Sequence, residues 1–241
     1  MSVSSAENAF AVKLFRRLPG RYDVLAEVLS FGQNARWRAE LVRHVVPGQP
    51  QRVLDVATGT AGVAIAVARQ CDARITGVDV SEEMLEIGRR RIEVAGLGGR
   101  VELGAARAEE LSFADETFDA VTFTYVLRYV GDPEATIAEL ARTLRGGGVM
   151  AGLDFFVPPN LMWHAAWWLY TRSVLPVAGL ALGGRAWWDV GRFLGPNISA
   201  HYRRRPLRRL LAEWEAAGME GVECRVMSLG GGIVMWGRKR A

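Results

Sequence analysis

The strongest constraint on the fold is an alternation of short apolar runs with amphipathic segments through the middle of the chain. Five runs have the length and composition of β-strands; they cover 52–57, 73–80, 100–106, 118–126 and 147–156. Parallel strands need long crossovers, usually helices, and these must pack on the faces of the sheet. The alternation therefore predicts a doubly wound α/β fold with a mostly parallel sheet.

The connecting segments carry the signals of helix ends. Helices are expected over 62–71, 81–96 and 132–148. Ser81 and Asp132, the latter before Pro133, are typical helix starts, and Gly96 and Gly146 are expected helix stops. A last helix and two strands, at 206–219, 221–229 and 231–239, bring the predicted sheet to seven strands.

The 241 residues form one domain of four parts by pattern. The first part, 1–50, is a helical N-terminal region with helices at 7–18 and 34–46, and the second, 51–156, is the core. The third part, 157–205, is a helical insertion after the fifth strand, and the fourth, 206–241, contains the final helix and two strands. Cys71 and Cys224 are too few for a disulfide scaffold or a zinc cluster, and no metal-ligand spacing is present. The charged start, with Lys13, is unlike a signal peptide. We expect a cytoplasmic protein without a metal.

The ends of the first two strands indicate a nucleoside site. In VLDVATGTAGVAIA, Asp55 ends a strand and Gly59 lies in a turn before a helix whose first N–H groups are free. Asp79 ends the next strand, where a carboxylate can accept both hydrogen bonds of a ribose diol. The Asp55 carboxylate would repel a pyrophosphate but suits a sulfonium. S-adenosylmethionine is therefore favoured over NAD, and a nicotinamide-dependent oxidoreductase is the alternative.

Five collinear stretches carry a resemblance to a known family. They read YDVLAEVLSFGQNARW, DVATGTAG, GVDVSEEML, AEELSFADETFDAVTFTYVLRYVGD and ELARTLRGGGVMAGLDF. Together they resemble the ubiquinone/menaquinone biosynthesis C-methyltransferases, which are class I S-adenosylmethionine-dependent enzymes with a Rossmann-like fold. The resemblance extends from about Phe10 to Lys239.

The resemblance implies a cofactor site at the ends of the strands. The residues implied on its methionine and ribose side are Asp55, Thr58, Gly59, Thr60, Asp79 and Val80. Met84, Ala108 and Glu109 would lie by the adenine, and Thr124 would face the sulfonium. Arg107 stands where the family has an Asp that accepts from the adenine amino group, which a guanidinium cannot do. Adenine recognition then falls to backbone carbonyls or another side chain.

Several positions on the substrate side depart from the family pattern. Asn34 replaces a His, Tyr129 replaces the Asn of GLRN, and Asp154 and Phe156 replace the Glu and Ser that close the fifth strand. The leading hypothesis is C-methylation of a prenylated hydroquinone or a related lipophilic phenol. The departures leave open a small-molecule O- or N-methyltransferase of specialised metabolism, and a third alternative is a non-catalytic protein that binds S-adenosylmethionine.

The catalytic candidates are a cation and three bases. Arg128 follows the fourth strand and could stabilise a phenolate, which would raise the electron density of the ring carbon. Asp154, His164 and His201 are candidate bases. The acceptor pocket is expected to involve Tyr22, Tyr125, Tyr129, Trp163 and Trp167.

The segment PPNLMWHAAWWLYTRSVLP, 158–176, could be a membrane span, a piece of core or a pocket wall. Its position inside one sheet domain and the internal Arg172 argue against a span. As a helix it places Trp163, Trp167 and Tyr170 on one face. We expect an apolar wall for the acceptor, with ordinary core or a homodimer contact as alternatives. The tryptophans could also rest on a membrane near the basic run 203–209, for which no nucleic-acid motif is present.

Overall fold

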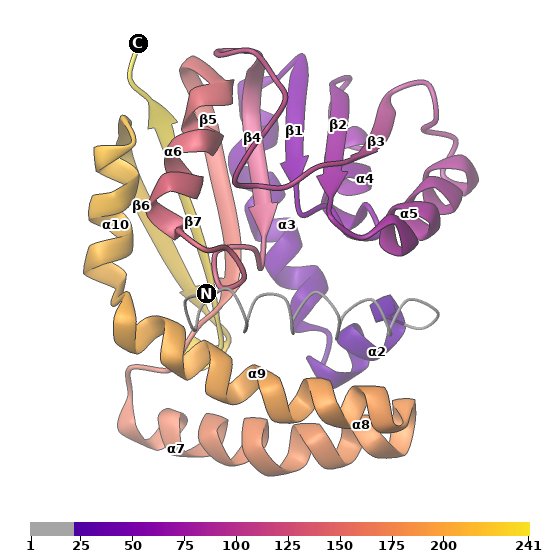
Figure 1. Ribbon diagram of the computed structural model, residues 1–241, viewed down its shortest axis with the longest axis vertical. Helices are drawn as coiled ribbons and strands as arrows, with labels where there is room; N and C mark the ends of the chain where they lie inside the picture. The colour runs from indigo at the N-terminus through magenta and orange to yellow at the C-terminus, as the bar shows by residue number, and fades with distance from the viewer. Residues whose placement is uncertain (1–21) are drawn as a thin grey trace.

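A computed structural model describes residues 22–241, so the helix expected at 7–18 lies outside the described residues. In this part of the chain the sheet has seven strands in the order β3-β2-β1-β4-β5-β7-β6 (Figure 1). They are β1 Arg52–Val56, β2 Arg74–Asp79, β3 Val101–Ala105, β4 Phe118–Thr124, β5 Leu144–Phe155, β6 Met219–Met227 and β7 Gly232–Lys239. Strand β7 runs antiparallel to both of its neighbours, β5 and β6, and the other six strands all point the same way. The predicted doubly wound, mostly parallel sheet is confirmed.

Helices cover both faces of the sheet (Figure 1). The first three are α2 Tyr22–Leu29, α3 Gln33–Val45 and α4 Gly62–Ala68, and the next two are α5 Glu82–Val94 and α6 Pro133–Thr143. After β5 come α7 Leu161–Leu169, α8 Leu175–Gly183, α9 Arg185–Arg204 and α10 Leu207–Ala216. Apolar residues of α6 and α10 pack on one face of the sheet, and those of α3, α4 and α5 on the other. The core therefore has two layers with the sheet between them.

Both predicted helix starts and one of the two predicted helix stops agree with the structure. The Ser81 hydroxyl accepts from the Met84 N–H, and the Asp132 carboxylate accepts from the N–H groups of Glu134 and Ala135. Gly96 has a φ of +68°, and the Leu97 N–H bonds to the Ile92 carbonyl, as in a Schellman end.

The prediction that Gly146 ends a helix was wrong. Helix α6 ends at Thr143, and Leu144 already belongs to β5. The pairing of β5 with β4 shifts register between Phe118 and Ala120, and Gly147 has a φ of +75°. The three glycines at 146–148 therefore allow an irregular strand entry, which non-glycine residues would resist.

The segment between β5 and α10 is helical from Leu161 to Arg204 except at Gly184. The helix expected within 158–176 begins at Leu161 and does not stop at Pro176, because a π-turn at Tyr170–Val174 leads directly into α8. Helix α9 returns alongside α8 in close contact, since a Cβ on Gly191 would lie 2.7 Å from Pro176 Cα. Figure 1 shows these helices across the end of the molecule at which β1 and β4 finish. Within residues 22–241, no helix has both the length and the apolar character needed to cross a membrane.

Candidate active site at the carboxyl ends of the strands

A cavity of about 410 Å³ lies at the carboxyl ends of β1, β2, β4 and β5. The strand order reverses between β1 and β4, where ligands bind in open α/β sheets. The turn after β1 and the end of β2 form one part of the wall, while α2, α3 and the helices α8 and α9 contribute the remainder. The volume is in the range of small-molecule sites. The cavity is therefore the candidate active site.

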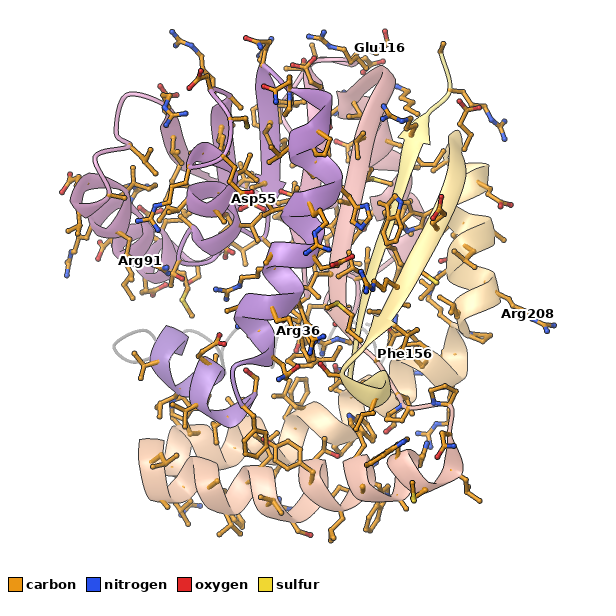
Figure 2. The ribbon with its side chains drawn as sticks, turned by 180° about the vertical axis from the view of Figure 1, so that it is seen from behind. Arg36, Asp55, Arg91, Glu116, Phe156 and Arg208 are labelled. Atoms are coloured by element: carbon orange, nitrogen blue, oxygen red, sulfur yellow. The ribbon has the colours of Figure 1, made fainter. Side chains whose placement is uncertain are left out.

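Asp55, at the end of β1, stabilises the turn that follows through a hydrogen bond from Thr58. Its carboxylate accepts hydrogen bonds from the hydroxyls of Thr58, at 2.6 Å, and Thr122, at 2.7 Å. Burial raises the pKa of Asp55 to about 6, against the opposing effect of these two bonds. Figure 2 shows Asp55 inside the molecule beside the sheet. The Asp55 carboxylate points to these hydroxyls, and the residue lies behind Thr58 of the lining and not in the lining itself.

Asp79 is fixed at the rim of the cavity by two backbone groups. One carboxylate oxygen accepts from the Gly59 N–H at 2.8 Å and the other from the Ser81 N–H at 2.9 Å. Burial raises the pKa of Asp79, and these two bonds oppose the shift. The Gly59 amide, which would bind phosphate in a dinucleotide fold, is thus already used. A carboxylate here suits a ribose diol and disfavours a pyrophosphate.

Most of the other predicted cofactor residues line the cavity. Thr58, Gly59, Thr60, Asp79, Val80, Met84 and Thr124 all line the cavity. No heavy atom lies within 4 Å of a Cβ built on Gly59, so a ligand can approach this turn closely. The structure therefore brings together side chains that fit the ribose and methionine parts of S-adenosylmethionine.

The residues predicted at the adenine edge are not part of this cavity. Ala108 is buried in the core, and Glu109 pairs with Arg107 at 3.0 Å. Arg107 is exposed, so it does not take the place of the family's adenine-binding Asp in the cavity. Of the residues predicted near adenine, Met84 alone lines the cavity, as a buried side chain of α5.

Arg128 is a buried cation in the wall of the cavity. Its Nε donates to Asp154 at 2.7 Å, and Nη1 donates to the hydroxyl of Tyr129 and the side-chain oxygen of Asn197, both at 2.8 Å. Within residues 22–241, Nη2 has no hydrogen-bond partner. Burial opposes the charge, but Asp154 and Tyr129 outweigh it and raise the pKa of Arg128. The guanidinium stays protonated, and its Nη2 is a buried donor without a partner among the described residues.

The predicted bases do not reach the cavity. Asp154 does not line it and accepts from Arg128 and the Phe155 N–H. His201 faces a separate cavity of about 20 Å³. Burial, with the charges of Arg128 and Arg205, lowers the pKa of His201 to about 3. The ring of His164 lies 3.3 Å from the Pro158 carbonyl, away from the cavity lining. We therefore assign Asp154 to positioning Arg128.

Aromatic side chains make up much of the cavity wall. Tyr125 stacks on Phe155 with ring centroids 4.7 Å apart, and Trp37 packs edge-on against Phe155 at 5.7 Å. The Tyr125 hydroxyl donates to Asn34 at 2.6 Å, which joins β4 to α3. Tyr125 has a φ of +57°, a strained conformation for a bulky residue that is often retained at functional sites. The pattern predicted Tyr125, whereas nothing in it indicated its bond to Asn34.

The remaining acceptor candidates occupy different places. Tyr129 and Trp167 line the cavity and Trp163 does not. Tyr22 begins α2, and its side chain is not described. Sequence reasoning missed the wall supplied by α9, namely Trp187, Val190, Leu194 and Ile198. Their spacing of three and four residues is that of one helix face and could have identified it.

Comparisons with known proteins agree with this geometry. The model of the ubiE/COQ5 methyltransferase family matches residues 3–239. A ubiquinone/menaquinone biosynthesis C-methyltransferase UbiE of Geotalea daltonii is 36% identical over 169 residues, 69% of this chain and 72% of its own. A demethylmenaquinone methyltransferase of Porphyromonas gingivalis is 32% identical over 228 residues, 94% of this chain and 91% of its own.

Solved structures support the fold. An S-adenosylmethionine-dependent methyltransferase from Thermotoga maritima superposes with a TM-score of 0.62 at 20% identity, covering 95% of this chain and 99% of its own. A geranyl diphosphate methyltransferase has a TM-score of 0.59 at 17% identity, covering 85% and 77%. At such identities the likeness concerns the fold. With the family match over nearly the whole chain, we conclude that the protein belongs to the ubiE/COQ5 methyltransferase family and is an S-adenosylmethionine-dependent methyltransferase.

Proposed function

We propose that the protein C-methylates the ring of a prenylated hydroquinone of the demethylmenaquinol type. One observation carries the proposal: Arg128, a buried and protonated arginine whose Nη2 lacks a partner among the described residues, lines the same largely apolar cavity as the cofactor-binding turn. The names of the relatives, which refer to ubiquinone, menaquinone and demethylmenaquinone, support it. A hydroquinone offers an oxygen to the arginine and an apolar body to the wall.

Arg128 would stabilise the ring oxygen as it becomes a phenolate. A buried donor without an acceptor costs about 1–3 kcal/mol, and a charged group costs more, so an acceptor oxygen at Nη2 is favoured. Negative charge on that oxygen raises electron density at the ortho and para ring carbons. Asp154 and Asn197 accept from Nε and Nη1 and hold the guanidinium in place, so little reorganisation is needed.

The reaction needs alignment and the exclusion of water. S-adenosylmethionine supplies an electrophilic methyl group on a sulfonium. The methyl group would pass to the ring carbon with the electron pair of the broken carbon–sulfur bond left on sulfur, and the attacked carbon would give up its proton to water when the product reaches solvent. Tyr125, Phe155 and Trp37 form a stacked wall that can orient a flat ring and exclude water.

A prenyl tail on the proposed acceptor favours a position of the enzyme at a membrane surface. A prenyl chain resides in a bilayer, and the described part of the protein has no helix that could span one. The cavity wall from α8 and α9, with Leu175, Val190 and Leu194, suits the first isoprene units. The proposed acceptor thus favours a peripheral position of the protein on the bilayer that holds the substrate.

The proposal is tested with labelled S-adenosylmethionine and short-chain demethylmenaquinol. We expect a product methylated on the ring carbon, from the reduced acceptor and not from its quinone. Arg128→Lys should lower kcat by roughly 100-fold or more, the scale for loss of an oxyanion donor, and should leave S-adenosylhomocysteine binding unchanged. Arg145→Lys is the matched control, because Arg145 also pairs with an aspartate, Asp119, at 2.7 Å but lies on the surface.

Three results would contradict the proposal. A methyl group found on oxygen would favour an O-methyltransferase. Equal turnover of Arg128→Lys and the wild type would remove the role of the guanidinium. Turnover of nitrogenous small molecules but of no hydroquinone would favour an N-methyltransferase.

A further inference from the structure

Helices α7 and α8, with the turn between them, carry eight exposed apolar side chains, here called the apolar strip. It consists of Leu161, Met162, Trp168, Leu169, Val174, Val177, Leu180 and Leu182. Leu161 is 86% exposed, Leu169 55% and Val177 59%. Single exposed apolar residues are ordinary, but eight within 22 consecutive residues of two successive helices are more than scattered exposure accounts for and indicate an interaction surface.

The apolar strip is continuous with the candidate active site. The same helical segment sends Trp167, Tyr170 and Leu175 into the wall of the cavity. Tyr170 also donates a hydrogen bond to the Leu29 carbonyl of α2, which ties this segment to the helix on the other side of the cavity. One wall of about a helix's thickness therefore separates the acceptor cavity from the apolar strip. Figure 1 shows α7 and α8 end to end along the outer border of the molecule.

The segment that carries the strip, together with the residues that follow it up to 209, is strongly basic. Between 157 and 209 the sequence has eight arginines and a single acidic residue, Asp189, a formal balance of +7 in a chain whose total is +4. Arg205 and Arg209 pair with Glu213 of α10, and Arg208 extends from α10 into solvent (Figure 2). Arg185 and Arg203, at the two ends of α9, are exposed.

Two arginines of this segment lie over tryptophan rings. The Arg172 guanidinium lies 5.1 Å from the ring centroid of Trp168, and that of Arg192 lies 5.9 Å from the ring of Trp188. Aromatic rings with arginines beside them suit the interface between hydrocarbon and charged headgroups, where each side chain has an apolar body and a polar end. Burial lowers the pKa of Arg172, and the charge of Arg203 adds to this effect.

We propose that the apolar strip docks on an anionic lipid bilayer, with the arginines of α9 on the headgroups. A second copy of the chain fits this surface less well, because a symmetric contact would bring two sets of arginines together with only Asp189 in each to compensate. The inference rests on the proposed function, since a prenylated acceptor resides in a bilayer. It adds which surface meets the lipid and brings the acceptor cavity to the membrane side.

Flotation with lipid vesicles tests the proposal without any turnover. The full chain should float with vesicles of phosphatidylcholine and phosphatidylglycerol, and more weakly with phosphatidylcholine alone. The triple variant Leu161→Ser, Leu169→Ser and Val177→Ser should bind at least about tenfold more weakly. The matched control is Val94→Ser, because Val94 is 92% exposed at the end of α5 and should not matter.

Charge-reversal variants test whether the arginines of α9 bind the anionic headgroups. Arg185→Glu with Arg203→Glu should abolish the preference for anionic vesicles, whereas Arg90→Glu, on an exposed position of α5, should retain it. Thermal unfolding and S-adenosylhomocysteine binding of every variant should match the wild type, which separates lost docking from lost folding.

The outcomes separate docking from function. Wild-type protein that stays unbound with anionic vesicles overturns the proposal, as does equal loss in Val94→Ser and in the triple variant. A dimer in sedimentation velocity that the triple variant converts to monomer, without vesicle binding, would assign the strip to self-association. Methylation of detergent-dispersed demethylmenaquinol without vesicle binding would sink the docking surface alone. Vesicle binding without methylation of any hydroquinone would sink the proposed function alone.

Discussion

Removing the Asp79 carboxylate tests the placement of the cofactor most directly. Both carboxylate oxygens are held by backbone N–H groups, of Gly59 at 2.8 Å and Ser81 at 2.9 Å, and each oxygen can accept a further bond. A hydrogen bond to a charged group contributes about 1.5–3 kcal/mol at most in net terms. Since a ribose diol exchanges bonds with water for bonds with Asp79, we expect Asp79→Ala to weaken binding by roughly 1–3 kcal/mol.

This loss corresponds to a dissociation constant raised by roughly 5- to 150-fold. Isothermal titration calorimetry with S-adenosylhomocysteine measures it well below the melting temperature. Asp72→Ala is the matched control, because Asp72 is a fully exposed aspartate whose nearest cation, on Arg100, lies 3.8 Å away. We expect the control to bind as the wild type does.

A second ligand distinguishes a lost contact from a disturbed turn. Asp79→Ala also removes the acceptor for the Gly59 N–H, so the turn after β1 could change shape. With the 2′,3′-dideoxy analogue of S-adenosylhomocysteine, the variant should lose much less affinity than with the parent ligand. An equal loss with both ligands would show that the effect passes through the turn. An unchanged dissociation constant for the parent would refute the ribose assignment.

Two further predictions concern stability. Gly152→Ala should lower the free energy of unfolding, measured in urea, by about 1–3 kcal/mol, because the new Cβ would lie 2.4 Å from the Phe123 ring. The control Gly99→Ala should change this free energy little, because a Cβ at Gly99 meets no atom within 4 Å. Equal effects of the two substitutions would contradict the packing argument. Asp55 has a folded pKa of about 6, above the ordinary 3.8, so the native state takes up this proton first as the pH falls. The buried, ionised Asp55 carboxylate therefore lowers the free energy of unfolding by about 3 kcal/mol above pH 6, and this cost should disappear towards pH 4. The difference in free energy of unfolding between the wild type and Asp55→Asn should consequently change between pH 6 and pH 4. A difference that stays constant over this range would refute the raised pKa.

The part of the fold that could be predicted is the part that local periodicity determines. The strands from 52 to 124 and the helix starts at Ser81 and Asp132 follow from alternation and from capping chemistry, which act within a few residues. The stop at Gly146 was wrong because glycine also serves an irregular strand entry, and only the pairing of β5 with β4 decides between the two uses.

The site was less predictable because its contacts join distant parts of the chain. Asp55 could be recognised as the end of a strand, but its orientation depends on the Thr122 hydroxyl of the neighbouring strand. Likewise Asn197, on α9, reaches Arg128 across 69 residues of sequence. A side chain's position along a strand predicts which end of the sheet it occupies and leaves its hydrogen-bond partners undetermined.

The departures from the family pattern on the substrate side are coupled in space. Tyr129 and Asp154 replace the expected Asn and Glu at positions far apart in the sequence, yet both bond to the guanidinium of Arg128, which the family pattern retains. A shorter carboxylate at 154 and a longer hydroxyl-bearing side chain at 129 supply one acceptor each to the same cation. The departures therefore change how Arg128 is held and preserve its charge and its Nη2 donor. Since that donor is what an oxygen-bearing ring needs, the departures are compatible with the hydroquinone acceptor and do not by themselves favour another chemistry.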